Sequence, residues 1–160
     1  MGKTLLLYAL ADLLKNNTVC CFSRRNGVDV SLLTDVERAL REVIENHSQI
    51  DFVINMAGIL ERGPLCDMSY DQISSMIGVN YTGVVNIAKE AFPYLKQTAG
   101  MLLLTASSSY TRGRKDYALY SSLKAATVNM TQALSSEWHK DNVKVNCIVP
   151  ARTKTPMREK

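Results

Sequence analysis

Hydrophobic positions follow two different periods along this chain, and the two periods alternate. Apolar residues recur at helical spacing in three segments, 5–14, 36–44 and 117–139. Continuous apolar or β-rich runs occupy four shorter segments, 18–22, 51–55, 101–106 and 143–149. Buried strands that alternate with helices predict an α/β protein in which a parallel sheet carries helices on both faces, joined by right-handed crossovers.

Two weaker patterns add to this prediction. Asp29–Val30 indicates another brief strand. A capping-box pattern opens a long helical stretch over 69–97. Within that stretch, Gly78 and Gly83 are local weaknesses, and Pro93 is expected to kink or break the helix.

Composition limits the classes of protein to which the chain can belong. Its 160 residues are 46% hydrophobic and 21% charged, which is the balance of one compact domain. The formal net charge of +4 is spread without a basic block, so we expect no nucleic-acid partner. The four cysteines have no CxxC spacing and the two histidines lie far from them, so we expect no metal site. Neither a membrane span nor a signal peptide is evident, which predicts a cytoplasmic protein.

Tyr120 and Lys124 form the first candidate for chemistry. Four residues separate them, so they lie one turn apart on the same face of the predicted helix. An adjacent cation stabilises a phenolate and lowers the pKa of a phenol from its usual value near ~10, which can turn a tyrosine into an acid–base catalyst. An ordinary exposed pair is the alternative.

Other polar residues follow the predicted strands directly. Ser107 comes after the strand at 101–106, and the segment Asn55-Met-Ala-Gly58 follows the strand at 51–55. Loops at the carboxyl ends of parallel strands gather around a ligand, so these residues are expected at one cleft. Asn80, in the middle of the long helix, could face the same cleft.

Together these residues resemble the short-chain dehydrogenase/reductase family, in which an Asn-x-Ala-Gly element, a helix Asn, a Ser and a Tyr-x-x-x-Lys pair occur in this order. The resemblance implies a Rossmann-like doubly wound sheet and hydride transfer between a nicotinamide and a carbonyl or alcohol substrate. It makes Tyr120 the general acid/base and Ser107 a hydrogen-bond donor to the carbonyl oxygen. Lys124 would lower the phenol pKa and hold the nicotinamide ribose, and Asn80 would position a relay water.

The same resemblance implies a set of cofactor-binding residues. They are Gly2, Ser23, Arg24, Arg25, Asp29, Val30, Asn55, Ala57, Gly58, Tyr120, Lys124, Pro150, Thr153 and Thr155. Within this set, Ser23-Arg24-Arg25 follows the strand at 18–22. An acidic residue there would bind a free ribose hydroxyl, whereas arginine favours the 2′-phosphate, so we expect NADP rather than NAD. A solvated turn carrying two arginines is the alternative.

The substrate is less visible in the sequence. Arg112, Arg114 and Lys115 lie between Ser107 and Tyr120, so an anionic or phosphorylated carbonyl compound is a plausible substrate. A solvated charged loop is an equal alternative. The run from Ser107 to Arg114 is also similar to reductase modules fused to sugar-phosphate cytidylyltransferases, which act on a pentulose phosphate.

Measured against the family, the chain is expected to be truncated at both ends. The family begins with a strand and a Thr-Gly-x-x-x-Gly-Ile-Gly turn that holds the pyrophosphate, and Gly2 matches only the final glycine of that turn. We therefore expect residues 1–160 to form a partial dinucleotide-binding oxidoreductase domain, lacking the first, central strand and the last strand. A catalytically silent family member and an interaction partner that pairs through its long helices, as in a homo-oligomer, are the alternatives.

Overall fold

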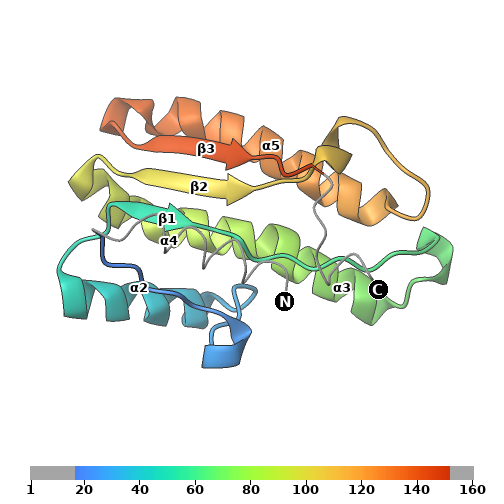
Figure 1. Ribbon diagram of the computed structural model, residues 1–160, viewed down its shortest axis with the longest axis horizontal. Helices are drawn as coiled ribbons and strands as arrows, with labels where there is room; N and C mark the ends of the chain where they lie inside the picture. Colours follow the sequence, from blue (N-terminus) through green and yellow to red (C-terminus); the bar gives the residue numbers. More distant parts are fainter. Residues whose placement is uncertain (1–16, 152–160) are drawn as a thin grey trace.

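The computed structural model of the protein describes residues 17–151, and its centre is a three-stranded parallel sheet. The strands are β1 (Phe52–Ile54), β2 (Met101–Thr105) and β3 (Lys144–Ile148), in the order β1-β2-β3 (Figure 1). Phe52 lies opposite Met101 in one pair, and Met101 lies opposite Lys144 in the other. The predicted strands at 51–55, 101–106 and 143–149 are therefore confirmed.

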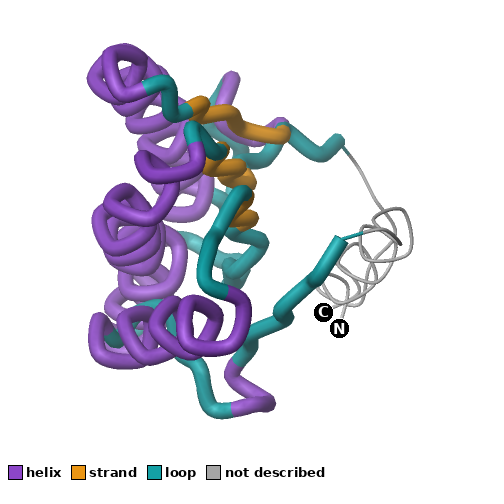
Figure 2. The backbone as a smooth tube through the Cα atoms, turned by 90° about the vertical axis from the view of Figure 1, so that its left-hand side faces the viewer, coloured by secondary structure: helices purple, strands orange, loops and turns teal. Residues whose placement is uncertain are grey.

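Four α-helices accompany the sheet in the described part of the chain. They are α2 (Leu33–His47), α3 (Tyr70–Ile77), α4 (Gly83–Thr98) and α5 (Ala118–Trp138). Short 3-10 turns at η1 (Arg24–Asn26), η2 (Leu65–Asp67), η4 (Ser108–Thr111) and η5 (His139–Asp141) join some of these elements. Figure 2 shows the long helices on one side of the strands. The expected helix over 5–14 is outside the described residues.

The core lies between the sheet and this helical layer. Leu102 and Leu104 in β2 are fully buried, as are Ala91 and Leu95 in α4. Strand side chains alternate between two faces, so Leu102 and Leu104 point the same way while their neighbours in β2 are only partly buried. Trp138, at the end of α5, packs against Phe92 of α4 with ring centroids 4.6 Å apart. Every second side chain in the apolar run of β2 therefore packs against the helical layer.

The segment 18–22 is not a strand, so that prediction is wrong. Four of its five residues are exposed and Phe22 is half-buried. A strand forms only where a neighbouring strand takes up its backbone hydrogen bonds, and no described strand lies beside this segment. A buried strand therefore does not form here, although the run is rich in β-forming residues.

Asp29–Val30 is a turn, not the brief strand that the sequence predicted. One carboxylate oxygen of Asp29 accepts hydrogen bonds from the Ser31 N–H at 3.0 Å and the Ser31 hydroxyl at 2.7 Å. The Asp29 N–H donates to the Asp35 carboxylate at 2.8 Å. Side chains of this kind offer the backbone an alternative to a sheet ladder, and here they fold it into the entry of α2.

The long helical stretch divides at the two glycines named from the sequence. A π-helical turn, η3 (Gly78–Thr82), separates α3 from α4. Gly83 is a close-approach site, because an added Cβ would lie 2.6 Å from Cγ2 of Val30 and 3.3 Å from its carbonyl carbon. The prediction for Pro93 is wrong in one respect, since α4 continues through Pro93 to Thr98 without a break.

Candidate active site

Ser107 stands where the ends of β2 and β3 come together. It lies two residues after β2 and caps the turn η4, where its Oγ accepts hydrogen bonds from the Ser109 N–H at 3.3 Å and the Ser109 hydroxyl at 3.1 Å. The Ser108 N–H donates to the Pro150 carbonyl at 3.2 Å. This backbone contact brings Pro150, an expected cofactor-binding residue, beside Ser107.

Lys124 is a buried ammonium on the helix that covers the sheet. Only 2% of the residue is exposed. Its Nζ donates to the carbonyl oxygen of Thr105 at 2.8 Å and lies 5.8 Å from the centroid of the Tyr120 ring. Because α5 packs on β2 and β3, the side chain reaches the carboxyl end of β2. The predicted Tyr–Lys pair is therefore close in space, and Lys124 is not an ordinary exposed residue.

Burial weakens the charged form of this lysine. Loss of solvent lowers the pKa of Lys124 to about 8, and the nearby Cys147 thiol opposes part of the change. At neutral pH most molecules still carry the ammonium charge. A cation is thus held beside Tyr120, in a position where burial makes its interactions strong.

The Tyr120 phenol does not follow the sequence-based expectation. Burial raises the pKa of Tyr120, hydrogen bonding with Ser107 offsets part of the rise, and Tyr117 adds to it. The Tyr117 ring meets the Tyr120 ring edge-on with centroids 6.3 Å apart. The net change in the pKa of Tyr120 is therefore a rise, because burial outweighs the opposing influence of Ser107. The expected lowering by Lys124 stays a prediction.

Asn80 is a buried tie between the helical layer and the loop after β1. Its side chain is fully buried in the π-helical turn, and its Nδ2 donates to the Ile59 carbonyl at 2.9 Å and the Met76 carbonyl at 3.0 Å. Its Oδ1 accepts from the Ile59 N–H at 3.2 Å. Both N–H groups of the amide donate to backbone carbonyls, so the Asn80 side chain positions the loop after β1. Its role in holding a relay water stays a prediction.

The segment Asn55–Gly58 continues from the carboxyl end of β1 without regular secondary structure. Asn55 is buried, and its Oδ1 accepts from the Ala57 N–H at 2.9 Å, while its own N–H continues the ladder to the Leu103 carbonyl. Ala57 and Gly58 follow, both half-buried. Together with Asn80 they fix the start of the next loop. Their contact with a cofactor stays a prediction.

The two arginines expected to select the cofactor lie on a separate turn. Ser23 and Asn26 close η1 through reciprocal hydrogen bonds, and Gly27 ends it at φ 80°. Arg24 and Arg25 are exposed, and within residues 17–151 their guanidinium groups have no ion pair or hydrogen bond. Gly2, Thr153 and Thr155 are outside the described residues.

Sequence reasoning missed two partners of the site. The Thr105 carbonyl that receives Lys124 left no signal, because every residue carries a carbonyl. Tyr117 did leave one, since it precedes Tyr120 by three residues and lies on the same side of the helix. The loop formed by Asn55 and its successors was identified, but its attachment to Asn80 required the fold.

A dinucleotide fits the polar groups left over at this edge of the sheet. The ammonium of Lys124 has three N–H donors, and the Thr105 carbonyl accepts a single one. Thr105 Oγ1 is buried without a partner among the described residues. Ribose hydroxyls and a carboxamide can satisfy such groups, and Ala57 and Gly58 leave the backbone accessible at the end of β1.

Within residues 17–151, none of the helices combines the length and the apolar character that a membrane span requires. The same residues hold no cluster of three or more side chains that could bind a metal ion. The cytoplasmic location stays a prediction.

The chain belongs to the short-chain dehydrogenase family, whose sequence model matches residues 10–160. It is similar to the bifunctional ribulose 5-phosphate reductase/CDP-ribitol pyrophosphorylase of Haemophilus influenzae, with 54% identity over 138 residues, covering 86% of this chain and 29% of that protein. It is also similar to the meso-2,3-butanediol dehydrogenase of Serratia marcescens, with 36% identity over 130 residues, covering 81% of this chain and 52% of the relative.

Solved structures show the same fold. A 3-ketoacyl-(acyl-carrier-protein) reductase from Brucella melitensis, complexed with NADH, superposes with a TM-score of 0.78 and 25% identity over 81% of this chain and 56% of its own. A gluconate 5-dehydrogenase from Burkholderia cenocepacia, in complex with NADP and tartrate, gives 0.77 and 25% identity over 81% and 51%. The chain spans about half the length of most of these proteins, or less. They establish an NAD(P)-dependent oxidoreductase family with a Rossmann-like sheet.

Proposed function

We propose that the protein is an NADP-dependent reductase that transfers a hydride between a nicotinamide and a carbonyl or alcohol substrate, with Tyr120 as general acid/base. The observation that carries the proposal is the grouping of Ser107, Tyr120 and Lys124 at the carboxyl end of β2. A hydroxyl, a phenol and a buried ammonium are thereby placed within one small region. Substrate reduction needs a proton donor and a hydrogen-bond donor for the same oxygen.

The residues divide the work as follows. The Ser107 hydroxyl donates a hydrogen bond to the carbonyl oxygen and orients the substrate. The Tyr120 hydroxyl gives its proton to that oxygen as negative charge develops there. The Lys124 ammonium favours the phenolate that Tyr120 leaves behind. When bound, the nicotinamide supplies the hydride.

NADP is the proposed cofactor. The support is the pair Arg24 and Arg25, which is exposed and unpaired within the described residues and is therefore available to a 2′-phosphate. The solved relatives bind NADH in one case and NADP in another, so the preference rests on these two residues.

A phosphorylated carbonyl compound is the proposed substrate class. The support is the similarity to a ribulose 5-phosphate reductase of Haemophilus influenzae together with the basic loop that holds Arg112, Arg114 and Lys115. A pentulose phosphate offers a carbonyl for Tyr120 and a dianion for this loop.

The test is NADPH oxidation by the purified chain with ribulose 5-phosphate, followed at 340 nm. Saturable turnover is expected in the parent chain, and Tyr120→Phe should lower kcat by at least about 100-fold. Tyr70→Phe is the matched control, because Tyr70 is 86% exposed at the start of α3. Unchanged turnover in Tyr120→Phe would contradict the proposal. Absence of NADPH binding would favour the catalytically silent alternative.

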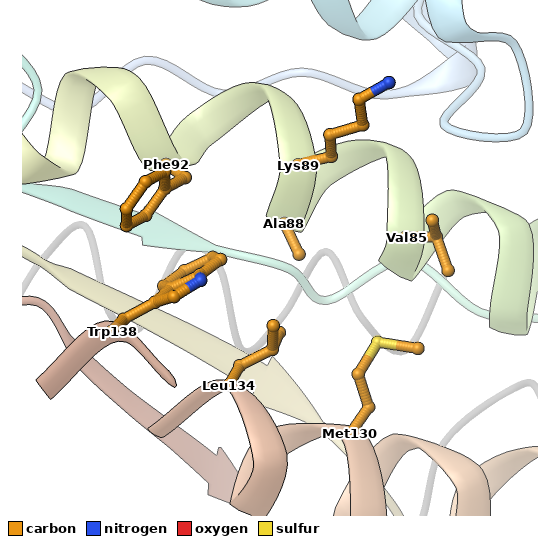
Figure 3. A pocket seen from close by; sticks show the side chains of 7 residues that line it. All are labelled: Val85, Ala88, Lys89, Phe92, Met130, Leu134 and Trp138. Atoms are coloured by element: carbon orange, nitrogen blue, oxygen red, sulfur yellow. The ribbon is translucent and has the colours of Figure 1, made fainter. Parts of the chain in front are cut away.

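A homo-oligomer through α4 and α5 is the proposed assembly. These helices line an apolar groove of about 410 Å³ on the outside of the helical layer, drawn in Figure 3. Its lining residues are Val85, Ala88, Lys89, Phe92, Met130, Leu134 and Trp138.

A second copy of the chain would cover the exposed parts of this groove. Sedimentation should show dimers or larger species, and Met130→Glu should shift them to monomers; a monomer at high concentration would overturn the assembly.

A further inference from the structure

Four cationic residues lie on two neighbouring loops near the candidate active site. Arg62 lies in the loop that follows β1, and Arg112, Arg114 and Lys115 lie in the loop between η4 and α5. Arg62, Arg112 and Lys115 are exposed, and Arg114 is half-buried. No ion pair or hydrogen bond of their side chains occurs within the described part of the chain. Glu61 and Asp116 are the acidic residues of the same loops, so the cations exceed the carboxylates.

A backbone hydrogen bond joins the two loops. The Gly63 N–H donates to the Asp116 carbonyl at 3.1 Å, which places the residue after Arg62 against the residue after Lys115. The first loop is also fixed at its beginning, because the buried Asn80 side chain holds both backbone groups of Ile59. The segment that contains Arg62 is therefore held by hydrogen bonds at Ile59 and at Gly63, and the second of these bonds joins it to the other loop.

The second loop is connected to the proposed acid–base group. The Tyr117 N–H donates to the Arg114 carbonyl at 3.1 Å, and the Tyr117 ring meets the Tyr120 ring edge-on. Ser107 lies at the other end of the same stretch of chain. A substrate whose carbonyl oxygen contacts Ser107 and Tyr120 therefore has a cationic loop within reach of its other end.

We infer that Arg62 and Arg114, from two different loops, form a binding site for the phosphate group of the substrate, with Arg112 and Lys115 at its rim. The inference rests on the proposed function for the position of the carbonyl. Arginine suits this task, because its planar guanidinium donates two parallel hydrogen bonds to a phosphate. Unpaired cations on fixed loops need not break existing ion pairs to bind an anion.

Titration calorimetry with NADP⁺ present tests this site, with ribulose 5-phosphate and ribulose as the two probes, because the oxidised cofactor cannot reduce either carbonyl during the titration. The parent chain is expected to bind the phosphate ester at least about tenfold more tightly than the free sugar. Arg62→Gln and Arg114→Gln should each reduce that preference by about tenfold, whereas Arg62→Lys should restore part of it. Arg41→Gln, an exposed arginine on α2, is the matched control and should leave it unchanged.

The inference would be overturned if the parent chain bound both probes equally well or bound neither of them. It would also be overturned if both glutamine variants kept the preference for the phosphate ester. The proposed function and the phosphate site can be tested separately. If the chain prefers the phosphate ester but never oxidises NADPH, the phosphate site is supported and the reductase function is contradicted. If the chain reduces both sugars equally well, the reductase function is supported and the phosphate site is contradicted.

Discussion

The ammonium of Lys124 donates a hydrogen bond to the carbonyl oxygen of Thr105 at 2.8 Å, from helix α5 to the last residue of strand β2. This contact holds the Lys124 side chain against the end of β2. Because Tyr120 lies one turn earlier on the same helix, the contact also helps to position Tyr120. It also buries a charge, which costs stability whenever the charge is present.

The stability of the protein should therefore increase with pH above about 8. The pKa of Lys124 is lowered to about 8 from 10.5, so above pH 8 the unfolded chain holds a proton that the folded chain has released. Folding then releases a proton and is favoured by higher pH, by up to about 3 kcal/mol across the window. Urea unfolding between pH 7 and 9.5 would measure this, and the increase should be absent in Lys124→Met. An equal increase in that variant would show that other groups cause it.

Replacement of Gly83 by alanine should destabilise the chain by about 1 to 3 kcal/mol. The added Cβ would lie 2.6 Å from Cγ2 of Val30 and 3.3 Å from its backbone carbonyl carbon, so relief requires movement of the turn before α2. Gly113→Ala is the matched control, because nothing lies within 4 Å of a Cβ there. Thermal unfolding would compare them. Equal melting temperatures for the two variants would contradict the close-approach explanation.

Removal of the Asn80 amide should cost more than removal of the Asn86 amide from the same helical stretch. Asn80→Ala leaves the Ile59 N–H and the Ile59 and Met76 carbonyls without that partner inside the fold, a loss of about 2 to 4 kcal/mol. Asn86→Ala removes one hydrogen bond, to the Val30 carbonyl at 3.0 Å, and should cost about 1 kcal/mol. Chemical unfolding would measure both. A smaller loss for Asn80 than for Asn86 would refute the positioning role.

Cofactor preference should depend on the turn η1. Arg24→Ala combined with Arg25→Ala should raise the KM for NADPH by roughly 10- to 100-fold and leave the KM for NADH within about twofold, since only NADPH carries a 2′-phosphate. Arg38→Ala is the control, because that guanidinium already pairs with Asp35 at 2.9 Å. If the KM values for NADPH and NADH rose equally in the double variant, the turn η1 would not be the source of NADP selectivity.

The sequence determined the family and most of the elements by itself. The order and spacing of Asn55, Asn80, Ser107, Tyr120 and Lys124 are local properties of the chain, and so are the periods that predicted β1, β2, β3, α2 and α5. The weak points at Gly78 and Gly83 were also visible, because glycine is less favourable than alanine in a helix by about 1 kcal/mol.

Only the tertiary structure decided whether strands form and how charges behave. The segment 18–22 has the composition of a strand but no described neighbour to pair with, and Asp29 directs its backbone into a turn through its own carboxylate. The pKa of Tyr120 is raised and that of Lys124 is lowered because both are buried, and burial depends on packing against distant residues. The pairing of Arg62 with the loop before α5 likewise depends on one hydrogen bond, between Gly63 and Asp116, which no periodicity encodes.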